Sequence, residues 1–257
     1  MAQLSDFRIL ICNDDGMFAD GIKILERIAR DITPDVWMVA PEFEQSGRAM
    51  GITFNKPLRI KELTPRKFVV EGTPADCVVV AIKHILVDKK PDLVISGINH
   101  GNNVGDTVFI SGTVGAAQIA SFFGIKSVAI SQDYNYGGTL KFDLEEHFLP
   151  RILKKLIKYE WPRKMTVNVN FPDASMTDVK GITVVPQGPM KIDWQVIERI
   201  DPVGMPYYWV RSNWDSLNPN LKNDVNALAD KYITITPIDT DLNNREIFED
   251  LEEFFAI

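Results

Sequence analysis

The sequence predicts an α/β protein with a doubly wound, mainly parallel sheet and helices on both of its faces. Over residues 1–172, short apolar runs typical of strands alternate with segments whose apolar residues recur at helical spacing, in units of roughly 30 residues. Two of the apolar runs end in polar clusters, at residues 13–16 and 97–106. Open α/β sheets bind their ligands at the carboxyl ends of the strands, so these clusters mark the expected functional edge.

The first two expected strands are separated by one helix. Residues 9–12 form a short apolar run, and apolar residues at helical spacing then continue until Pro34 stops them. A second strand is expected at residues 36–40. From residue 52 to residue 70 prolines interrupt β-like pieces, so short strands are expected there instead of another helix.

The next helix has a clear start signal. Thr73 is suited to cap a helix that has Pro74 at its first position and Asp76 at its third, where a carboxylate favours the positive end of the helix dipole. The helix is expected to continue to Leu86. A crossover helix of this kind is what parallel pairing of the flanking strands requires.

A loop rich in glycine and asparagine follows the third expected strand. That strand covers residues 93–96 and the loop covers residues 97–106. Ordering so flexible a loop is costly unless the loop serves a purpose. A helix is expected to begin at Ser111 and to end at Gly124, before a fourth strand at residues 127–131. The catalytic groups are therefore expected in the first half of the chain.

The chain is expected to divide into a Rossmann-like catalytic domain, residues 1–172, and a C-terminal oligomerisation region, residues 173–257. A helix over residues 142–159 and a strand over residues 165–170 complete the first part. The second part is expected to hold a β-hairpin arm, a returning strand and a C-terminal helix, with strands at 182–185, 207–210 and 232–236 and the helix at 247–255. Such arms suit exchange between the subunits of a homodimer or homotetramer.

The composition excludes several classes of partner. The formal net charge is −7 and no basic run is present, so neither polymeric nucleic acid nor an anionic membrane is expected to bind. Cys12 and Cys77 are too few for a disulfide framework or a thiolate metal site. The N-terminus lacks the layout of a signal peptide and no apolar run is long enough to span a bilayer, which predicts a cytoplasmic location.

Two adjacent carboxylates end the first strand. Asp14 and Asp15 must either share a proton or bind a cation, and a cation is the expectation; a turn with a capping aspartate is the alternative. Ser46 and Asn99 follow two other expected strands, and each is flanked by glycine or lies in a glycine-rich loop. Together these side chains make an all-oxygen site suited to Mg²⁺ or Mn²⁺.

The start of the expected helix at Ser111 is a candidate anion site. Ser111, Gly112 and Thr113 offer backbone N–H groups, two hydroxyls and the positive end of a helix dipole. Alone, such a segment is usually only a helix cap. Beside a metal site it predicts a phosphate pocket. His100 lies in the glycine-rich loop, and the sequence leaves its role open.

Five ordered motifs, and weaker similarity farther on, resemble the SurE family of metal-dependent nucleoside monophosphate phosphatases. The matching stretches are Asn13-Asp14-Asp15-Gly16, Ala40-Pro41 with Gln45-Ser46-Gly47, Gly72-Thr73-Pro74-Ala75-Asp76-Cys77, Ser96-Gly97-Ile98-Asn99, and Ser111-Gly112-Thr113-Val114. The resemblance extends over nearly the whole chain.

The resemblance implies a role for each matching residue. One divalent metal ion per subunit, Mg²⁺ or Mn²⁺, would be held by Asp14, Asp15, Ser46 and Asn99. The substrate and phosphate side would be lined by Asn13, Asn99, Asn103, Ser111, Gly112 and Thr113. The family also exchanges C-terminal arms between subunits. Two departures bear on substrate preference: Ile110 replaces a frequent tyrosine, and Thr107 stands where a second acid often follows Asp106.

The predicted activity is hydrolysis of nucleoside 5′-monophosphates, and the sequence leaves open whether 3′-monophosphates and short polyphosphate are also cleaved. In this prediction the metal polarises the phosphate, and a water attacks in line. Asp14 and Asp15 are the catalytic candidates, since either could orient or deprotonate the water or attack directly. Two alternatives stay open: a haloacid-dehalogenase-like phosphatase with Asp14 as nucleophile, and a nucleotide sensor that binds without turnover.

Overall fold

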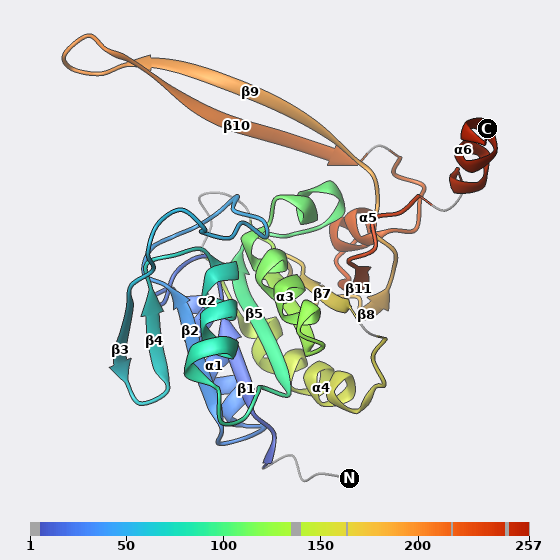
Figure 1. Ribbon diagram of the computed structural model, residues 1–257. Coiled ribbons are helices and arrows are strands. Elements are labelled where there is room, and N and C mark those ends of the chain that lie inside the picture. The colour runs from blue at the N-terminus through green and yellow to red at the C-terminus, as the bar shows by residue number, and fades with distance from the viewer. Residues whose placement is uncertain (1–5, 135–139, 163, 217, 245–246, 257) are drawn as a thin grey trace.

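The computed structural model describes residues 6–134, 140–162, 164–216, 218–244 and 247–256, and over these residues the chain forms one large sheet and a separate hairpin (Figure 1). The sheet has nine strands in the order β3-β4-β2-β1-β5-β6-β7-β11-β8, and the hairpin pairs β9 with β10. The predicted α/β class is confirmed.

The central strands are parallel, as the alternating pattern predicted. They are β2 (Val36–Pro41), β1 (Ile9–Cys12), β5 (Leu93–His100), β6 (Lys126–Gln132) and β7 (Met165–Phe171). β4 (Lys67–Val70) pairs in parallel with β2, and β3 (Ile60–Thr64) closes that edge antiparallel to β4. The carboxyl ends of the central strands therefore share one edge of the sheet.

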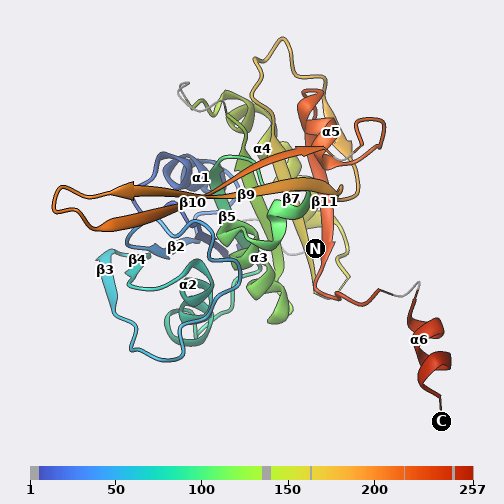
Figure 2. The same cartoon turned by 90° about the horizontal axis from the view of Figure 1, so that it is seen from above.

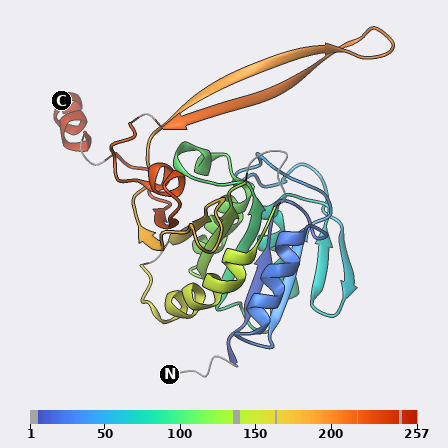
Figure 3. The ribbon, with the colours of Figure 1, turned by 180° about the vertical axis from the view of Figure 1, so that it is seen from behind.

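Helices cover both faces of this sheet because successive side chains of a strand point to opposite faces. Ile9 and Ile11 of β1 belong to the apolar cluster with α1 (Asp20–Arg30) and α4 (Asp143–Lys158), which lie in front in Figure 3. Leu10 and Cys12 belong to the cluster with α2 (Pro74–Val80) and α3 (Gly112–Phe122). Full burial of each such aliphatic side chain stabilises the fold by roughly 1.5–3 kcal/mol. No helix among the described residues combines the length and apolarity that crossing a bilayer requires.

The start of α2 has the predicted cap. The Asp76 backbone N–H donates to Thr73 Oγ1 at 3.0 Å, and the Thr73 N–H donates to Asp76 Oδ2 at 2.9 Å. Two helix-start donors are thus satisfied reciprocally, and Pro74 at the first position has no N–H to satisfy. The helix continues as a π-helical segment, η2 (Ala81–Ile85).

β5 is longer than the sequence indicated. The glycine at position 97 was expected to end the strand and open a loop, but β5 continues to His100. A Cβ on Gly97 would lie 2.3 Å from the Ile130 carbonyl oxygen, and the φ of Gly97 is +138°, so only glycine permits this close approach to β6. The register shifts there, and Asn99 then pairs with Ser131. The glycine therefore marks a strand irregularity and not a strand end.

Two strands from the C-terminal region extend the same sheet. β11 (Ile233–Asp239) pairs antiparallel with β7, and β8 (Ile182–Val184) lies in parallel beside β11. α5 (Asp224–Ala229), which the sequence did not indicate, precedes β11. The sheet thus crosses the predicted boundary at residue 172, and the division into residues 1–172 and 173–257 stays a prediction.

The remaining C-terminal elements project from the body. β9 (Met190–Ile200) and β10 (Pro206–Ser216) form a long hairpin that extends across the carboxyl edge of the sheet (Figures 1 and 2). Only residues 207–210 of this hairpin were located from the sequence. α6 (Phe248–Phe255) stands apart from the sheet in Figure 3, and none of its residues is buried.

Candidate active site at the carboxyl edge

Asp14 and Asp15 follow the end of β1 with Asn13 between, and Asp14 lies against the start of α3. The Thr113 hydroxyl donates a hydrogen bond to Asp14 Oδ1. A Cβ on Gly112 would lie only 2.8 Å from Asp14 Oδ2, so this position must be glycine for the helix to pack so closely on the carboxylate. The Gln45 N–H donates to the Asp14 carbonyl at 2.7 Å, which attaches the loop after β2 to the same place.

The two carboxylates are held in surroundings that disfavour their charged forms. Burial, with repulsion from Asp15 adding to it, raises the pKa of Asp14 to about 7. Burial raises the pKa of Asp15 to about 6, and the charge of Glu44 contributes. Among the described residues no lysine or arginine pairs with either carboxylate. Such a pair is a strong candidate for binding a cation.

His100 is the basic group recorded beside this pair. Its Nδ1 lies 3.8 Å from Asp15 Oδ1, and its backbone N–H donates to Asp15 Oδ2 at 3.3 Å. Burial lowers the pKa of His100, which favours a neutral imidazole near pH 7. His100 therefore positions Asp15 without neutralising it, a role that the sequence left open.

The two neutral ligands predicted for a metal reach the same edge by different routes. The Asn99 Nδ2 group donates a hydrogen bond to the Gly101 carbonyl at 2.8 Å. This bond fixes the orientation of the amide and leaves Asn99 Oδ1 available to bind a metal. Ser46 is exposed in the loop that Gln45 anchors on Asp14. Asn99 precedes His100, whose backbone N–H contacts Asp15, and Ser46 follows Gln45, whose N–H contacts Asp14. The metal site formed by Asp14, Asp15, Asn99 and Ser46 stays a prediction.

The donor chemistry fits a hard divalent cation. Within the described ranges no group of three or more His, Cys, Asp and Glu side chains could hold a metal, so ligands beyond the two aspartates must be neutral oxygens or water. The buried Asn13 Oδ1 next to them has no hydrogen-bond partner among these residues, while Asn13 Nδ2 donates to the Gly16 carbonyl at 2.9 Å. Two carboxylates, an amide and a hydroxyl suit Mg²⁺ or Mn²⁺.

The residues predicted for the phosphate side have structural roles as well. The Ser111 hydroxyl accepts from the Val114 N–H at 3.1 Å and so caps α3. Asn103 is buried, and its Nδ2 donates to Ser131 Oγ at 2.8 Å. Its carbonyl accepts from the side chains of Asn168 at 2.6 Å and Asn170 at 3.1 Å. Asn103 therefore fixes the loop after β5 on the ends of β6 and β7.

Sequence reasoning missed the polar residues beneath this loop. Ser131, Asn168 and Asn170 were expected to lie in strands, and Asn168 and Asn170 also lie in a stretch that resembles the family, but none of the three was given a role in the site. Each is fully buried, and Asn170 Oδ1 accepts from the Asn103 N–H at 2.7 Å. The sequence did contain a signal, the alternation of asparagine with valine in β7. A buried asparagine needs a hydrogen-bond partner, so this alternation indicated polar contacts beneath the loop.

Comparison with known proteins identifies the family. The family model described as "Survival protein SurE" matches residues 9–193. The chain belongs to the SurE family. A 5′-nucleotidase SurE of Parvibaculum lavamentivorans is 45% identical, over 96% of this chain and 90% of the relative. A 5′-nucleotidase SurE of Paramagnetospirillum magneticum is 42% identical, over 99% of this chain and 98% of the relative.

A solved SurE structure has the same fold. The crystal structure of the SurE protein from Aquifex aeolicus superimposes with a TM-score of 0.83 at 33% sequence identity, covering 97% of this chain and 100% of that one. The family resemblance and the fold predicted from the alternation of strands and helices are both confirmed.

Proposed function

We propose that this SurE chain is a 5′-nucleotidase, a metal-dependent phosphomonoesterase that converts nucleoside 5′-monophosphates to nucleoside and phosphate in the cytoplasm. The observation that carries the proposal is the pair Asp14 and Asp15, buried at the carboxyl edge with raised pKa values and with no lysine or arginine partner among the described residues. The two relatives named 5′-nucleotidase, at 45% and 42% identity, support the reaction.

The predicted metal ligands and the start of α3 have different parts in this reaction. Asp14, Asp15, Asn99 and Ser46 would hold the metal, which when bound supplies positive charge to the phosphate and to a water molecule. The Thr113 hydroxyl fixes Asp14 in place. The first N–H groups of an α-helix lack intrahelical partners, so those of Gly112 and Thr113 are suited to bind the phosphate oxygens.

Water is the nucleophile in this proposal, and Asp15 orients it. Asp15 is less buried than Asp14, so its carboxylate is the more accessible of the two for a hydrogen bond from water. Attack on phosphorus in line with the leaving oxygen would then release the nucleoside. The backbone and side-chain contacts of His100 hold Asp15 in this orientation.

The two departures from the family pattern differ in their bearing on the substrate. The Thr107 hydroxyl donates to the Val104 carbonyl at 2.6 Å inside the 3₁₀-helix η3 (Gly105–Phe109), so this residue serves the loop itself. Ile110 is 38% exposed next to Ser111. Where the family often has the phenol ring of a tyrosine, this chain therefore presents an aliphatic side chain. Substrate scope, including 3′-monophosphates and short polyphosphate, therefore depends more on Ile110 than on Thr107.

Phosphate release in the presence and absence of a chelator tests the proposed reaction. With Mn²⁺ or Mg²⁺ the protein is expected to release phosphate from nucleoside 5′-monophosphates. Addition of a chelator should stop the release, and excess metal should restore it. Nucleotide binding without any phosphate release in either metal would replace the proposal with the sensor alternative.

We propose further that the hairpin β9–β10 packs on a second copy of the chain. Its exposed side chains include Trp209 at 62% and Val196 at 69% exposure. A two-stranded hairpin is at best marginally stable alone in water, and a large exposed apolar surface marks an interaction site. These properties support a homodimer or homotetramer joined through the arms.

Shortening the hairpin tests this assembly. Val196 pairs with Val210, so removal of residues 197–209 and insertion of an Asn-Gly turn keeps the base of the hairpin intact. The shortened protein is expected to have a lower oligomeric mass by light scattering. As a control, Phe54→Ser alters a residue of the body that is 91% exposed and should leave the mass unchanged. An unchanged mass for the shortened protein would contradict the arm-mediated assembly.

A further inference from the structure

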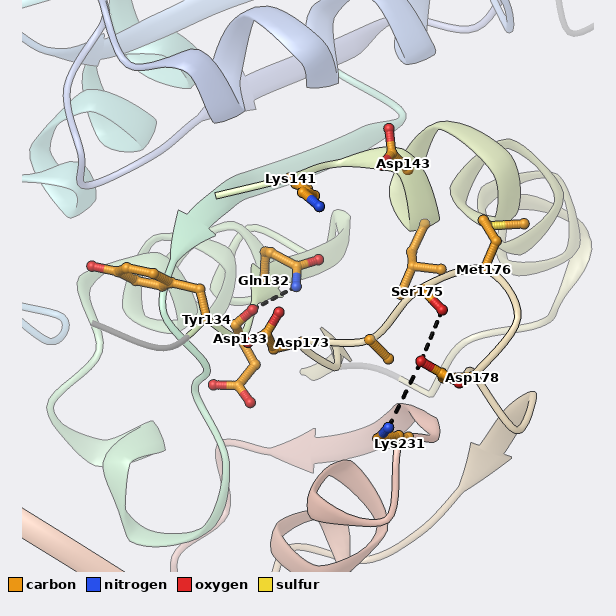
Figure 4. Close-up of a pocket in the computed structure, with 12 residues that line it drawn as sticks. Gln132, Asp133, Tyr134, Lys141, Asp143, Asp173, Ser175, Met176, Asp178 and Lys231 are labelled. Atoms are coloured by element: carbon orange, nitrogen blue, oxygen red, sulfur yellow. Dashed lines mark hydrogen bonds and ion pairs between the residues drawn. The ribbon is translucent and has the colours of Figure 1, made fainter. Parts of the chain in front are cut away.

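A cavity opens at the same edge of the sheet, two strands from the strand that Asp15 follows. We call it the β6–β7 cavity; it has a volume of about 650 Å³ and is lined by the end of β6, the start of α4, the loop after β7 and Lys231 (Figure 4). None of the residues assigned to the metal or phosphate lines it. Its chemistry therefore needs a separate explanation.

Gln132 supplies a buried acceptor without a partner in this cavity. The side chain is 4% exposed, and its Nε2 donates to the carbonyls of Asp133 at 2.6 Å and Pro172 at 3.1 Å. These two bonds fix the orientation of the amide, because only the nitrogen can donate to both carbonyls. Its Oε1 is buried and accepts no hydrogen bond from the described residues. Such an atom costs about 1–3 kcal/mol, which a ligand N–H or O–H would recover.

The charges around the cavity favour a neutral ligand rich in hydrogen-bond donors. Among the described residues, the charged groups of the lining are Asp133, Asp143, Asp173, Asp178, Lys141 and Lys231. One of the two lysines already lies near a carboxylate, with Lys231 Nζ 3.9 Å from Asp178 Oδ2. Carboxylates therefore outnumber ammonium groups, and a second phosphate would be repelled.

The position of the cavity suits the part of a substrate that is remote from its phosphate. His100 is the register partner of Gln132, and its imidazole lies 3.8 Å from Asp15. Asp15 follows β1, so two strand spacings of about 4.8 Å separate the cavity from the metal site. Asn102 also joins the two regions, because its Nδ2 donates to Asp133 Oδ1 at 2.7 Å. A ligand with its phosphate at Asp15 can therefore extend toward Gln132.

We propose that the β6–β7 cavity binds the base of the nucleotide, and that Gln132 Oε1 accepts a hydrogen bond from a base N–H group. This inference rests on the proposed nucleotidase function and adds the site of nucleoside recognition to it. Each of the common bases carries an N–H donor, so one acceptor serves several nucleotides. Gln132 is a specificity residue and takes no part in the reaction at phosphorus.

Kinetics with and without the base test the role of Gln132. For Gln132→Leu, the KM for AMP is expected to rise about tenfold, as loss of one hydrogen bond implies, while kcat changes less than about twofold. Ribose 5-phosphate lacks the base, so its kcat/KM should not change. Gln118→Leu removes another largely buried glutamine, on α3 outside this cavity, and should alter neither substrate.

A second variant, Ser175→Trp, fills the cavity without altering a buried residue, and Thr177→Trp is its control. Ser175 is exposed and lines the cavity, whereas Thr177, two residues along the same loop, is exposed outside the lining. Ser175→Trp is expected to raise the KM for AMP but not for ribose 5-phosphate, and Thr177→Trp to change neither.

The outcomes separate this inference from the proposed function. If phosphate is released but Gln132→Leu and Ser175→Trp leave AMP kinetics unchanged, or weaken AMP and ribose 5-phosphate equally, the cavity does not bind the base. If no nucleoside monophosphate is hydrolysed in Mn²⁺ or Mg²⁺, the nucleotidase proposal itself is wrong. Should Gln132→Leu not fold, the Ser175→Trp and Thr177→Trp comparison decides.

Discussion

Replacement of Asp15 by asparagine is expected to reduce metal-dependent phosphate release by more than about a hundredfold. A metal ion supplies several kcal/mol of charge stabilisation in phosphoryl transfer, and each 1.36 kcal/mol corresponds to a factor of ten in rate. The asparagine side chain would retain a neutral oxygen but not the charge that holds the cation. The measurement is phosphate release from AMP over a range of Mn²⁺ concentrations.

The stability of Asp15→Asn distinguishes loss of the site from loss of the fold. Burial and the charge of Glu44 disfavour the ionised form of Asp15, and the Asp15 charge also raises the pKa of Asp14. The metal-free variant should therefore be at least as stable as the wild type near pH 8. Added Mn²⁺ should raise the unfolding temperature of the wild type only, because a ligand stabilises the state that binds it.

Asp20→Asn is the matched control for this substitution. Asp20 begins α1 with a side chain that is 77% exposed, and it pairs with Lys23 at 2.9 Å. An exposed ion pair contributes little, so activity and Mn²⁺ stabilisation should both persist. Near-normal turnover by Asp15→Asn, or Mn²⁺ stabilisation equal to that of the wild type, would contradict the assignment of Asp15 to the metal.

Local signals explain why much of the fold could be predicted. The strands near the centre of the sheet are buried on both faces, so they appear as continuous apolar runs such as Ile9–Cys12. Thr73, Pro74 and Asp76 form a cap within four residues, which the sequence alone can indicate. Asp14 and Asp15 were found for the same reason, because they interrupt an apolar run at its end.

Contacts between distant residues explain what could not be predicted. Asp224 accepts from the N–H groups of Gly105 at 2.9 Å and Gly188 at 2.8 Å, and so joins the start of α5 to the loop after β5. Neither contact has a local signal, since Asp224 and Gly105 are 119 positions apart. β9 was missed because its exposed residues lack a buried face to impose a period of two. Gly97 was misinterpreted because glycine signals strand ends and strand irregularities alike.

Replacement of Glu145 by glutamine is expected to stabilise the protein at alkaline pH. Glu145 lies in the first turn of α4 with 0% exposure, and neither carboxylate oxygen has a partner among the described residues. Burial raises its pKa from 4.5 to about 8, and the neighbouring charges of Asp143 and Glu146 contribute. The folded state therefore keeps a proton on Glu145 that the unfolded state has released.

The sign of the pH effect follows from this difference in bound protons. Between pH 4.5 and about 8 the native state binds more protons than the unfolded state, so wild-type stability falls as pH rises and the loss levels off above pH 8. Glutamine does not titrate. The variant should equal the wild type near pH 5 and exceed it near pH 9 by a few kcal/mol, on the order that a shift of this size implies.

Urea unfolding at pH 5, 7 and 9 measures this effect, with Glu146→Gln as the control. Glu146 is adjacent in sequence, but its side chain is 49% exposed and pairs with Arg27. Its charge is a smaller cause of the raised pKa of Glu145 than burial is, so its substitution should produce a much smaller gain at pH 9 than Glu145→Gln does. Asp14 and Asp15 also have raised pKa values, so they too lower the stability as the pH rises. Both residues are present in wild type and variant, so their effect cancels. The difference in free energy of unfolding between wild type and Glu145→Gln therefore reports on Glu145 alone. If this difference stays constant from pH 5 to pH 9, the Glu145 carboxyl ionises in the folded protein as it does in the unfolded chain, and the prediction is wrong.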